Sequence, residues 1–220
     1  MKSILVIGMG RLGRHFAGKM LALGNDVMIV DKDDDVIEEL SSVFTDCQIG
    51  DCRQEAVLRS IGVNNFDLCF VAIGEDFQAS LEITSMLSEL GASFILSKAS
   101  EDRQAKFLKL VGANEVVYPE RDAAEKLAMR YNADNIFDYV KLTSEYSIYE
   151  IPVVPVWVGK SINSLDIRRK YKINIIATKR NNVLNPMPDP DYVFSPGEHI
   201  VVMGKSRDVY HLANQSKTHK

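Results

Sequence analysis

The residues whose types and spacing could do chemistry begin with a glycine-rich turn near the start of the chain. Gly8, Gly10 and Gly13 follow an apolar run. Asp31 closes the next apolar run. In such a pattern the first glycine makes a tight turn, the second lets a phosphate approach the backbone, and the third lets a helix pack closely. Phosphates then lie at the helix N-terminus, and an acid about 20 residues further on accepts the ribose hydroxyls. The spacing therefore predicts a Rossmann-type nucleotide site.

Small and polar residues also follow each later apolar run, where further strands are expected to end. Ligands of a parallel sheet bind at the carboxyl ends of its strands, so these residues are expected to surround one site. With the turn itself, the candidate nucleotide-binding residues are Gly8, Met9, Gly10, Arg11, Leu12, Asp31, Lys32, Asp51, Cys52, Ile73, Gly74, Glu75, Lys98, Ala99, Ser100 and Glu120.

Charged residues limit which nucleotides could bind but do not identify one. Asp31 would repel a 2′-phosphate, which argues against NADP. Arg11 adds a cation beside the phosphates, and this suits a di- or triphosphate at least as well as a dinucleotide. Glu120 facing phosphates would need Mg²⁺ or Ca²⁺ between them, because such ions prefer oxygen ligands. The alternative for Glu120 is an ion pair with Arg121 or Lys126.

Apolar runs that alternate with amphipathic segments predict the elements that carry these residues. Six such runs precede residue 131, and strands that alternate with helices indicate a parallel sheet. The acidic run 33–35 is interpreted as a helix start, since carboxylates stabilise a helix N-terminus. We expect an α/β fold, with a doubly wound parallel (Rossmann) sheet over 1–131 and a linker over 132–138. A second, smaller α+β domain is expected over 139–220.

Within the second domain the pattern predicts fewer and shorter elements. The expected elements are a strand pair over 147–158, one helix over 161–171, a strand over 173–178, an extended loop through Pro186, Pro188 and Pro190, a strand over 200–204 and a helix over 206–213, followed by a frayed tail.

Bulk composition excludes several classes of protein. The chain has 220 residues, of which 46% are hydrophobic and 25% charged, as in globular proteins. The net charge of −4 argues against a nucleic-acid partner. Apolar runs are too short to span a bilayer, and the N-terminus lacks a signal peptide, so a cytoplasmic protein is expected. The three cysteines suit no common zinc pattern and are expected to be reduced thiols.

Catalytic groups are not evident in the sequence. His199, His211 and His219 all lie in the small domain or the tail, and His15 lies on the first predicted helix. A dehydrogenase needs an acid or base against the nicotinamide, and no such group is indicated. We therefore expect a protein that binds a nucleotide and is not an enzyme. The alternatives are an NAD-dependent oxidoreductase and a regulator of a cation/proton antiporter.

The ordered set of motifs resembles the cytosolic RCK (KTN) regulatory subunits of potassium transport systems, the KtrA/TrkA family. The resemblance covers nearly the whole chain, with an N-terminal Rossmann domain and a C-terminal RCK_C domain. It rests on residues 7–13, 30–31, 50–51, 71–74, 98–99, 118–122, 161–162, 165–168 and 194–204.

The resemblance implies roles for residues of the first domain. Arg11 would contact the phosphates, while Asp31 and its neighbours, including Asp33, would hold the ribose. Asp51 and Cys52 would flank the adenine, and Glu120 would approach the phosphates or a metal cation. Gln104 stands near the phosphates where some relatives have histidine, which leaves the choice between ATP/ADP and NAD(H) open.

The resemblance also implies an assembly and a second ligand. Dimers would assemble into an octameric ring that docks on a membrane potassium channel or transporter subunit and gates it. Two copies of the C-terminal domain would bind cyclic di-AMP between them. The matching residues are Arg168, Asn174, Ile175, Ile176 and Pro190, although Ile175 and Ile176 could equally form a core strand.

Overall fold

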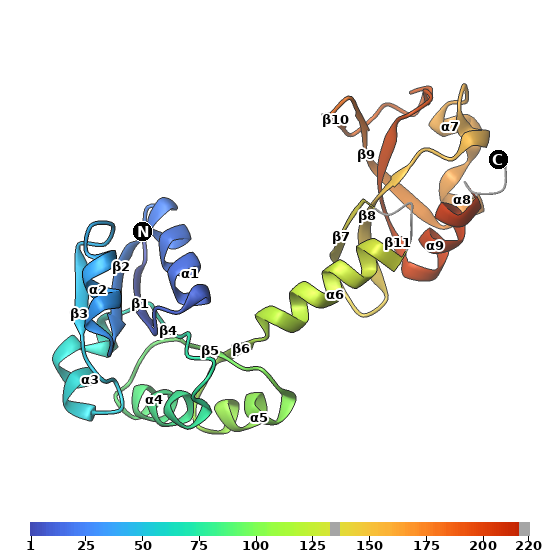
Figure 1. Ribbon diagram of the computed structural model, residues 1–220. Helices are drawn as coiled ribbons and strands as arrows, with labels where there is room; N and C mark the ends of the chain where they lie inside the picture. The colour runs from blue at the N-terminus through green and yellow to red at the C-terminus, as the bar shows by residue number, and fades with distance from the viewer. Residues whose placement is uncertain (133–136, 216–220) are drawn as a thin grey trace. The chain divides into compact units, whose positions relative to one another are not determined.

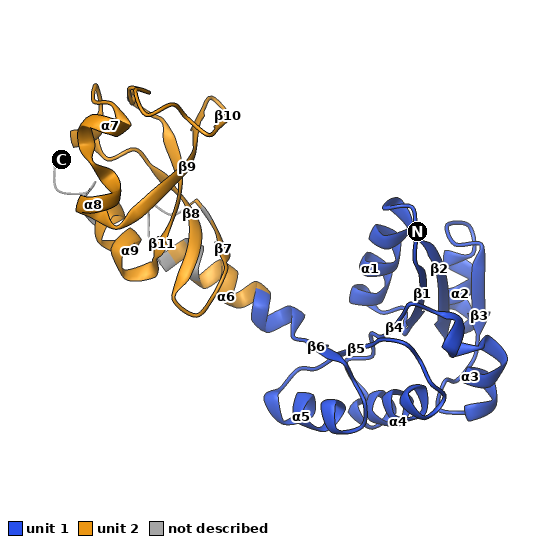
Figure 2. Cartoon of the chain, turned by 180° about the vertical axis from the view of Figure 1, so that it is seen from behind, with its two compact units in different colours: residues 1–122 blue, residues 123–220 orange. Residues whose placement is uncertain are grey.

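The computed structural model describes residues 1–132 and 137–215 as two compact units, Met1–Asp122 and Ala123–Lys220 (Figure 2). The boundary falls within a helix, α6 (Pro119–Asn132), which Pro119 begins. The predicted domain limits at 131 and 139 stay predictions. Within the predicted linker and tail, residues 133–136 and 216–220 lie outside the described residues.

Unit 1 is a six-stranded sheet with strand order β3-β2-β1-β4-β5-β6, and all its pairings are parallel (Figure 1). Its strands are β1 (Ser3–Ile7), β2 (Asp26–Asp31), β3 (Asp46–Ile49), β4 (Leu68–Val71), β5 (Ile95–Lys98) and β6 (Glu115–Val117). Its helices are α1 (Arg11–Ala22), α2 (Asp34–Leu40), α3 (Glu55–Ile61), the 3₁₀ turn η1 (Val63–Asn65), α4 (Phe77–Glu89) and α5 (Asp102–Leu110). The predicted doubly wound sheet is confirmed.

Apolar side chains on both faces of β1 explain the layers of unit 1. Ile4 and Val6 pack with residues of α1 and α2. Leu5 and Ile7 pack on the other face with residues of α3 and α4. Successive side chains of a strand point to opposite faces, so a strand that is apolar throughout needs helices on both sides. Only the ends of such strands remain open to a ligand.

Unit 2 contains a five-stranded antiparallel sheet with strand order β10-β9-β11-β8-β7. Its strands are β7 (Asp138–Lys141), β8 (Tyr146–Pro152), β9 (Ile173–Arg180), β10 (Val183–Pro186) and β11 (His199–Lys205). Its further helical elements are η2 (Pro155–Trp157), α7 (Ile162–Leu165), α8 (Ile167–Tyr171) and α9 (Ser206–Gln215). The predicted smaller α+β domain is confirmed.

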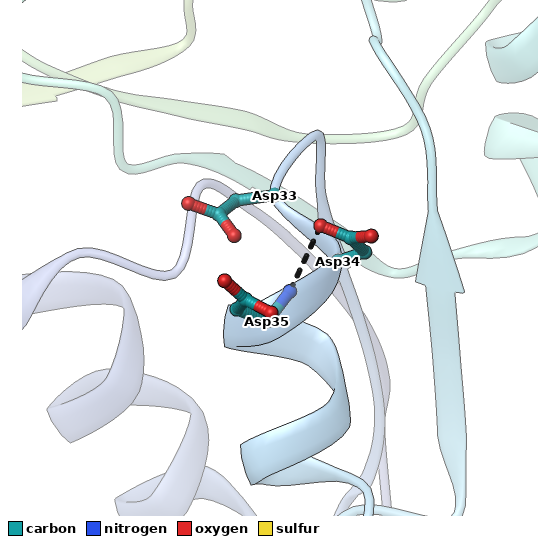
Figure 3. A group of neighbouring side chains, drawn as sticks. All are labelled: Asp33, Asp34 and Asp35. Carbon is teal, nitrogen blue, oxygen red and sulfur yellow. Dashed lines mark hydrogen bonds between the residues drawn. The ribbon is translucent and has the colours of Figure 1, made fainter.

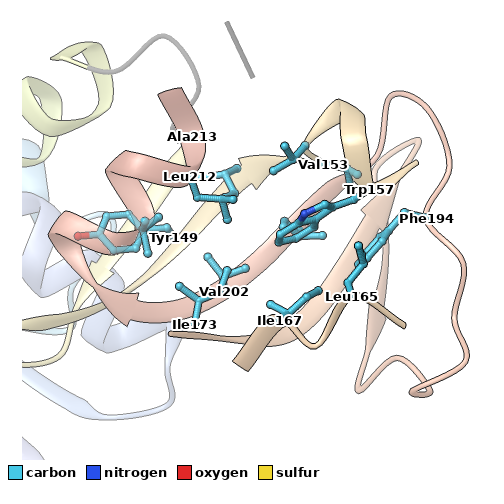
Figure 4. Close-up of a cluster of buried hydrophobic side chains, with 14 residues drawn as sticks. Tyr149, Val153, Trp157, Leu165, Ile167, Ile173, Phe194, Val202, Leu212 and Ala213 are labelled. Atoms are coloured by element: carbon cyan, nitrogen blue, oxygen red, sulfur yellow. The ribbon is translucent and has the colours of Figure 1, made fainter. Parts of the chain in front are cut away.

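The core of unit 2 lies on one face of its sheet and centres on aromatic residues (Figure 4). Trp157 is fully buried, and its ring centroid lies 5.7 Å from that of Phe194. The indole Nε1–H donates to the hydroxyl of Tyr171 at 3.3 Å. Tyr149 and Val202 reach the same core from β8 and β11. The opposite sheet face is left free to carry polar side chains, as is common for antiparallel sheets.

Several element predictions for unit 2 are wrong. Residues 147–158 form one strand and a 3₁₀ turn instead of a strand pair, because Pro155 begins the turn that buries Trp157. The single helix predicted over 161–171 is broken at Asp166, whose φ of 47° is left-handed. Pro186 ends an edge strand within the predicted loop, where the missing N–H of proline is tolerated.

No helix among the described residues has both the length and the apolar character that a membrane crossing requires.

Candidate functional site

A cavity of about 650 Å³ opens at the carboxyl ends of the parallel strands of unit 1. The strand order reverses between β1 and β4, and ligands of doubly wound sheets bind in the crevice at such a switch point. The lining residues are Ile7, Gly8, Gly10, Arg11, Leu12, Val30, Asp31, Lys32, Gly50, Asp51, Cys52, Arg53, Ala72, Ile73, Gly74, Glu75, Asp76, Ala79, Ile83, Lys98 and Glu120.

Two of the three glycines in the turn are required by the protein itself. Gly8 has a φ of +92°, and a Cβ there would lie 2.9 Å from Cγ1 of Ile73. A Cβ on Gly13 would lie 2.0 Å from the carbonyl oxygen of Gly8, a distance that no packing adjustment permits. These glycines therefore allow β1 to turn directly into α1.

The remaining glycine, Gly10, has a different reason to lack a side chain. A Cβ at this position would meet no protein atom within 4 Å, so the open space there is available to a ligand. Gly10 is also the N-cap of α1, and no side chain caps that helix or places an acid in its first turn. The first N–H groups of α1 are thus open to an anion, and Arg11 beside them adds a positive charge.

The carboxylate of Asp31 is held against the glycine turn by backbone groups. Its Oδ2 accepts the N–H of Met9 at 2.6 Å, and its Oδ1 accepts the N–H of Asp33 at 3.1 Å. A carboxylate offers about four lone-pair sites, so both oxygens can still accept ribose hydroxyls. Asp31 thereby connects the end of β2 with the turn that follows β1.

The acidic run 33–35 starts α2, as the sequence indicated (Figure 3). Asp33 is the N-cap, and its side chain accepts the N–H of Val36 at 3.3 Å. Asp34 accepts the N–H of Asp35 at 3.1 Å. These carboxylates form the one group of three metal-ligand side chains found in the described part of the chain, and all are exposed. Their contacts are those of a helix start.

Asp51 and Arg53 form a two-pronged ion pair on the rim of the cavity. Arg53 Nε lies 3.0 and 3.1 Å from the two Asp51 carboxylate oxygens, and its Nη2 lies 2.7 Å from Oδ2. The hydrogen bond from Arg53 is the main reason that the pKa of Asp51 is lowered. Cys52 beside them is buried, and this burial, with a smaller effect of Asp51, raises its pKa to about 12. Cys52 is therefore a neutral thiol that contributes an apolar wall.

Lys98 and Glu120 meet on the opposite rim of the cavity. Lys98 Nζ lies 2.7 Å from Glu120 Oε1, and this hydrogen bond lowers the pKa of Glu120. The predicted pairing of Glu120 with Arg121 or Lys126 is thus replaced by one with Lys98, while Arg121 binds Asp102 at 2.7 Å. Proteins commonly bind Mg²⁺ through one or two carboxylates together with substrate phosphates and waters. Glu120 already carries the ammonium of Lys98, and the metal at Glu120 stays a prediction.

Five of the predicted nucleotide-binding residues do not line the cavity. Met9 is buried in the core beneath the turn, and Asp33 caps α2. Ala99 is buried with α5 residues, while Gln104 accepts the N–H of Ser100 at 2.9 Å. Met9, Asp33, Ala99 and Ser100 stand next to lining residues or in the same loops, whereas Gln104 lies on α5 and reaches that loop through Ser100.

Eight lining residues were missed by the sequence reasoning. Most are apolar or small residues whose lining role shows no distinct sequence signal, and Arg53 could have been found as a cation two residues after Asp51. The missed residues are Ile7, Val30, Gly50, Arg53, Ala72, Asp76, Ala79 and Ile83.

A smaller cavity of about 290 Å³ in unit 2 brings together most of the predicted cyclic di-AMP residues. Arg168, Asn174, Ile175 and Pro190 line it, and Arg168 Nε donates to Asn174 Oδ1 at 2.8 Å. Ile176 is half-buried on β9 and does not line this cavity. Ile175 also packs against the core, as the core-strand alternative expected, and its role in binding cyclic di-AMP stays a prediction.

Comparison with known proteins matches both units. Residues 4–119 match the TrkA-N domain and residues 147–217 match the TrkA-C domain. Ktr system potassium uptake protein C of Bacillus subtilis is 38% identical over 208 residues, which cover 94% of this chain and 94% of that protein. Ktr system potassium uptake protein A of the same organism is 32% identical over 214 residues, covering 97% and 96%.

A solved structure has the same fold. The GsuK channel bound to NAD aligns with a TM-score of 0.68 at 20% identity and covers 97% of this chain. This chain spans 38% of the length of that one. The fold of this chain thus occurs within a longer chain.

Proposed function

The chain belongs to the RCK family of potassium transport regulators built from TrkA-N and TrkA-C domains, and on that premise we propose that it senses a nucleotide and thereby gates a membrane potassium channel or transporter. In this role the chain is a cytoplasmic subunit, peripheral to the membrane through its partner. Its dimers assemble into an octameric ring, and it binds no nucleic acid.

The observation that carries this proposal is the uncapped start of α1 above the glycine turn. Gly10 leaves open space there, and Arg11 lines the cavity beside it. Phosphates bind at such a helix start because its N–H groups and dipole favour negative charge. Asp31, which accepts the N–H of Met9 in the same turn, would accept the ribose hydroxyls. Adenine nucleotides of the ATP/ADP or NAD(H) type satisfy all of these groups.

The nucleotide acts as a signal in this proposal. Among the described lining residues there is no histidine or tyrosine to serve as an acid or base, Lys98 is paired with Glu120, and Cys52 is a neutral thiol. A site of this kind favours reversible binding over hydride transfer, which weighs against the oxidoreductase alternative. Two potassium uptake proteins among the relatives weigh against the antiporter alternative.

Regulation then follows from differential binding. A ligand shifts an equilibrium only when it binds one conformation better than the other. A γ-phosphate contacted by Arg11 supplies such a difference between ATP and ADP. The typical coupling free energy of about 1–3 kcal/mol corresponds to roughly a 5–150-fold change in affinity, enough to switch a ring between states.

Cyclic di-AMP is a second candidate ligand, favoured by the grouping of Arg168, Asn174, Ile175 and Pro190 around one cavity. Its volume of about 290 Å³ is at the low end of ligand pockets, which span about 300–1,000 Å³. Two copies facing each other would therefore be needed to enclose a dinucleotide, and Arg168 of each copy would bind a phosphate.

Native mass spectrometry of the full chain with ATP, ADP, NADH and cyclic di-AMP tests ligand choice and ring size together. We expect a bound nucleotide in each subunit and an octamer. A monomer that binds none of these ligands would contradict the proposal.

The role of Arg11 is tested by the Arg11→Ala variant in calorimetric titrations with ATP and with adenosine. We expect ATP affinity to fall roughly tenfold, since a charge-assisted hydrogen bond contributes about 1.5–3 kcal/mol. Adenosine affinity should change little, because it has no phosphate. Arg59→Ala, at an exposed position of α3, is the matched control. Equal loss for both ligands would disprove the phosphate contact.

A further inference from the structure

The rim of the unit 1 cavity carries an arginine that has no role in the proposed function so far. Arg53 lines the cavity beside Asp51 and Cys52, in the turn between β3 and α3. In the proposed function Arg11 meets the phosphates and Asp31 meets the ribose. The base remains, and the family resemblance implies that Asp51 and Cys52 lie beside it.

Arg53 already uses the carboxylate of Asp51. Oδ1 accepts the backbone N–H of Arg53 at 3.0 Å and its Nε–H at 3.0 Å. Oδ2 accepts from Nη2 at 2.7 Å and from Nε at 3.1 Å. A carboxylate offers about four lone-pair sites, so Asp51 has little capacity left to bind a base directly. Asp51 therefore acts on a ligand through Arg53.

The turn fixes the position of the guanidinium before a ligand binds. Asp51 holds both the backbone and the side chain of Arg53, and its carbonyl oxygen accepts the N–H of Gln54 at 2.9 Å. Gly50 lets the turn pack against α3, because a Cβ there would lie 2.9 Å from Cγ1 of Val57. A side chain that is already held in place loses little entropy on binding. The guanidinium is therefore a preorganised flat surface.

Buried apolar side chains line the same cavity as Arg53. Cys52 and Ile83 belong to one hydrophobic cluster, and Ala79 is buried on the first turn of α4. Asp51 chiefly, and to a smaller extent acidic groups of α4 and its N-cap, raise the pKa of Arg53, so the guanidinium lies near this helix. An apolar wall and a flat cation thus occur together in one part of the cavity.

We propose that Arg53 binds the base of the nucleotide, with its guanidinium stacked on the face of a purine ring and with Asp51 as the residue that positions it. A guanidinium is planar and stacks on aromatic faces through a cation–π interaction. The apolar wall contacts the rest of the ring. This role rests on the proposed function, since it requires a nucleotide in the cavity. Arg53 then sets the affinity for the purine, whereas Arg11 distinguishes ligands by their phosphates.

Calorimetric titration of the full chain with ATP and with CTP tests the stacking, because these two ligands differ only in the base. We expect the wild type to bind ATP more tightly, since a purine ring covers more of the guanidinium than a pyrimidine ring does. Arg53→Lys keeps the charge and removes the plane. It should weaken ATP about fivefold, as expected for the loss of a cation–π contact, and should weaken CTP less. Arg59→Lys, at an exposed ion-paired arginine of α3, is the matched control and should bind both ligands as the wild type does.

Paired variants test whether Asp51 acts through Arg53. The measured quantity is the ratio of ATP affinity to CTP affinity, because a general loss of structure or charge affects both ligands equally. Asp51→Ala should lower this ratio, since the guanidinium loses its fixed position. Added to Arg53→Lys, it should lower the ratio little further, because the plane that it positions is then absent. Full additivity of the two substitutions would overturn the positioning role of Asp51.

The outcomes separate this role from the proposed function. If the wild type bound no ATP, the proposed function and the role of Arg53 would both be overturned. If the wild type bound ATP but Arg53→Lys left the ratio of ATP to CTP affinity unchanged, only the role of Arg53 would be overturned. Equal affinity of the wild type for ATP and CTP would overturn the purine assignment.

Discussion

The two units place their cavities in different parts of a sheet. In unit 1 the cavity lies at the carboxyl ends of parallel strands and is lined largely by loop residues and glycines. In unit 2 the larger cavity, of about 740 Å³, lies over one face of an antiparallel sheet, and three side chains from within strands, those of Glu150, Lys179 and His199, contribute to its lining. Parallel sheets are covered on both faces, whereas antiparallel sheets can leave one face free.

This difference decides what each cavity depends on. The unit 1 site depends on backbone shape, because Gly8 and Gly13 permit the turn and backbone N–H groups face the ligand position. The unit 2 cavity depends on charge, because Glu150 holds Lys179 and His199 in place. Backbone shape is sensitive to added atoms, and a charged cluster is sensitive to pH.

The largest expected effect would test whether the two units are independent. Trp157→Ala should destabilise unit 2 by roughly 3–5 kcal/mol, because a fully buried aromatic side chain leaves a cavity. ATP binding by unit 1 should persist, as measured by calorimetry beside urea unfolding followed by circular dichroism. Val156→Ala, at a half-exposed neighbour, is the control and should change stability by about 0.5 kcal/mol or less. Loss of ATP binding in Trp157→Ala would show that the two units are not independent.

A pair of glycine variants would sharpen the dependence of unit 1 on backbone shape. Gly13→Ala should cost about 1–3 kcal/mol or more through overpacking, since its Cβ meets the Gly8 carbonyl, and nucleotide binding should be lost. Gly10→Ala should leave stability within about 0.5 kcal/mol, because no protein atom lies near. Its nucleotide affinity should nevertheless fall in calorimetry. If Gly10→Ala bound the nucleotide as tightly as the wild type does, the phosphate would not lie at this turn.

The smallest expected effect is a change in how the stability of unit 2 depends on pH. Burial alone would raise the pKa of Glu150, but hydrogen bonds from His199 and Lys179 outweigh it and lower the pKa from 4.5. A lowered folded-state pKa stabilises the fold above the unfolded value, and that contribution is lost as pH falls through the folded value. Urea unfolding between pH 7 and pH 3 should therefore show a steeper decline for the wild type than for Glu150→Gln.

Glu150→Gln should itself cost on the order of 1 kcal/mol at pH 7, the typical net value of a hydrogen bond. Glu145→Gln is the control, because Glu145 pairs with Lys205 on the surface. Parallel pH curves for the wild type and Glu150→Gln would contradict the role given to this cluster.

The residues around the cavity of unit 1 could largely be predicted, because they lie close to sequence motifs that mark the ends of strands. The glycine turn, Asp31 and the residues that end each strand are adjacent to apolar runs, and parallel strands bring such ends together. Arg53 was missed although it follows Asp51 closely, since cations in loops are common. For Glu120 the alternative to a role beside the phosphates was an ion pair with Arg121 or Lys126, whereas Lys98 on β5 reaches it. A contact across strands depends on register, which spacing along the chain does not state.

Unit 2 was less predictable because its strands are short and its polar groups are far apart in sequence. Asp166 interrupts a helix that the apolar periodicity predicts to be continuous, since aspartate tolerates the left-handed conformation. β7 and β10 lie at the sheet edges and carry weak alternation. Glu150, Lys179 and His199 gave no motif, because only antiparallel pairing makes them neighbours.

The sequence by itself determined the fold class, the glycine turn and the family, because glycine spacing and apolar runs act over short stretches of chain. Tertiary structure alone decided which side chains meet across strands. Lys98 with Glu120 and the cluster around Glu150 both arise in this way. Local sequence sets the backbone conformation, whereas ion pairs between strands depend on register and on which face of the sheet remains uncovered.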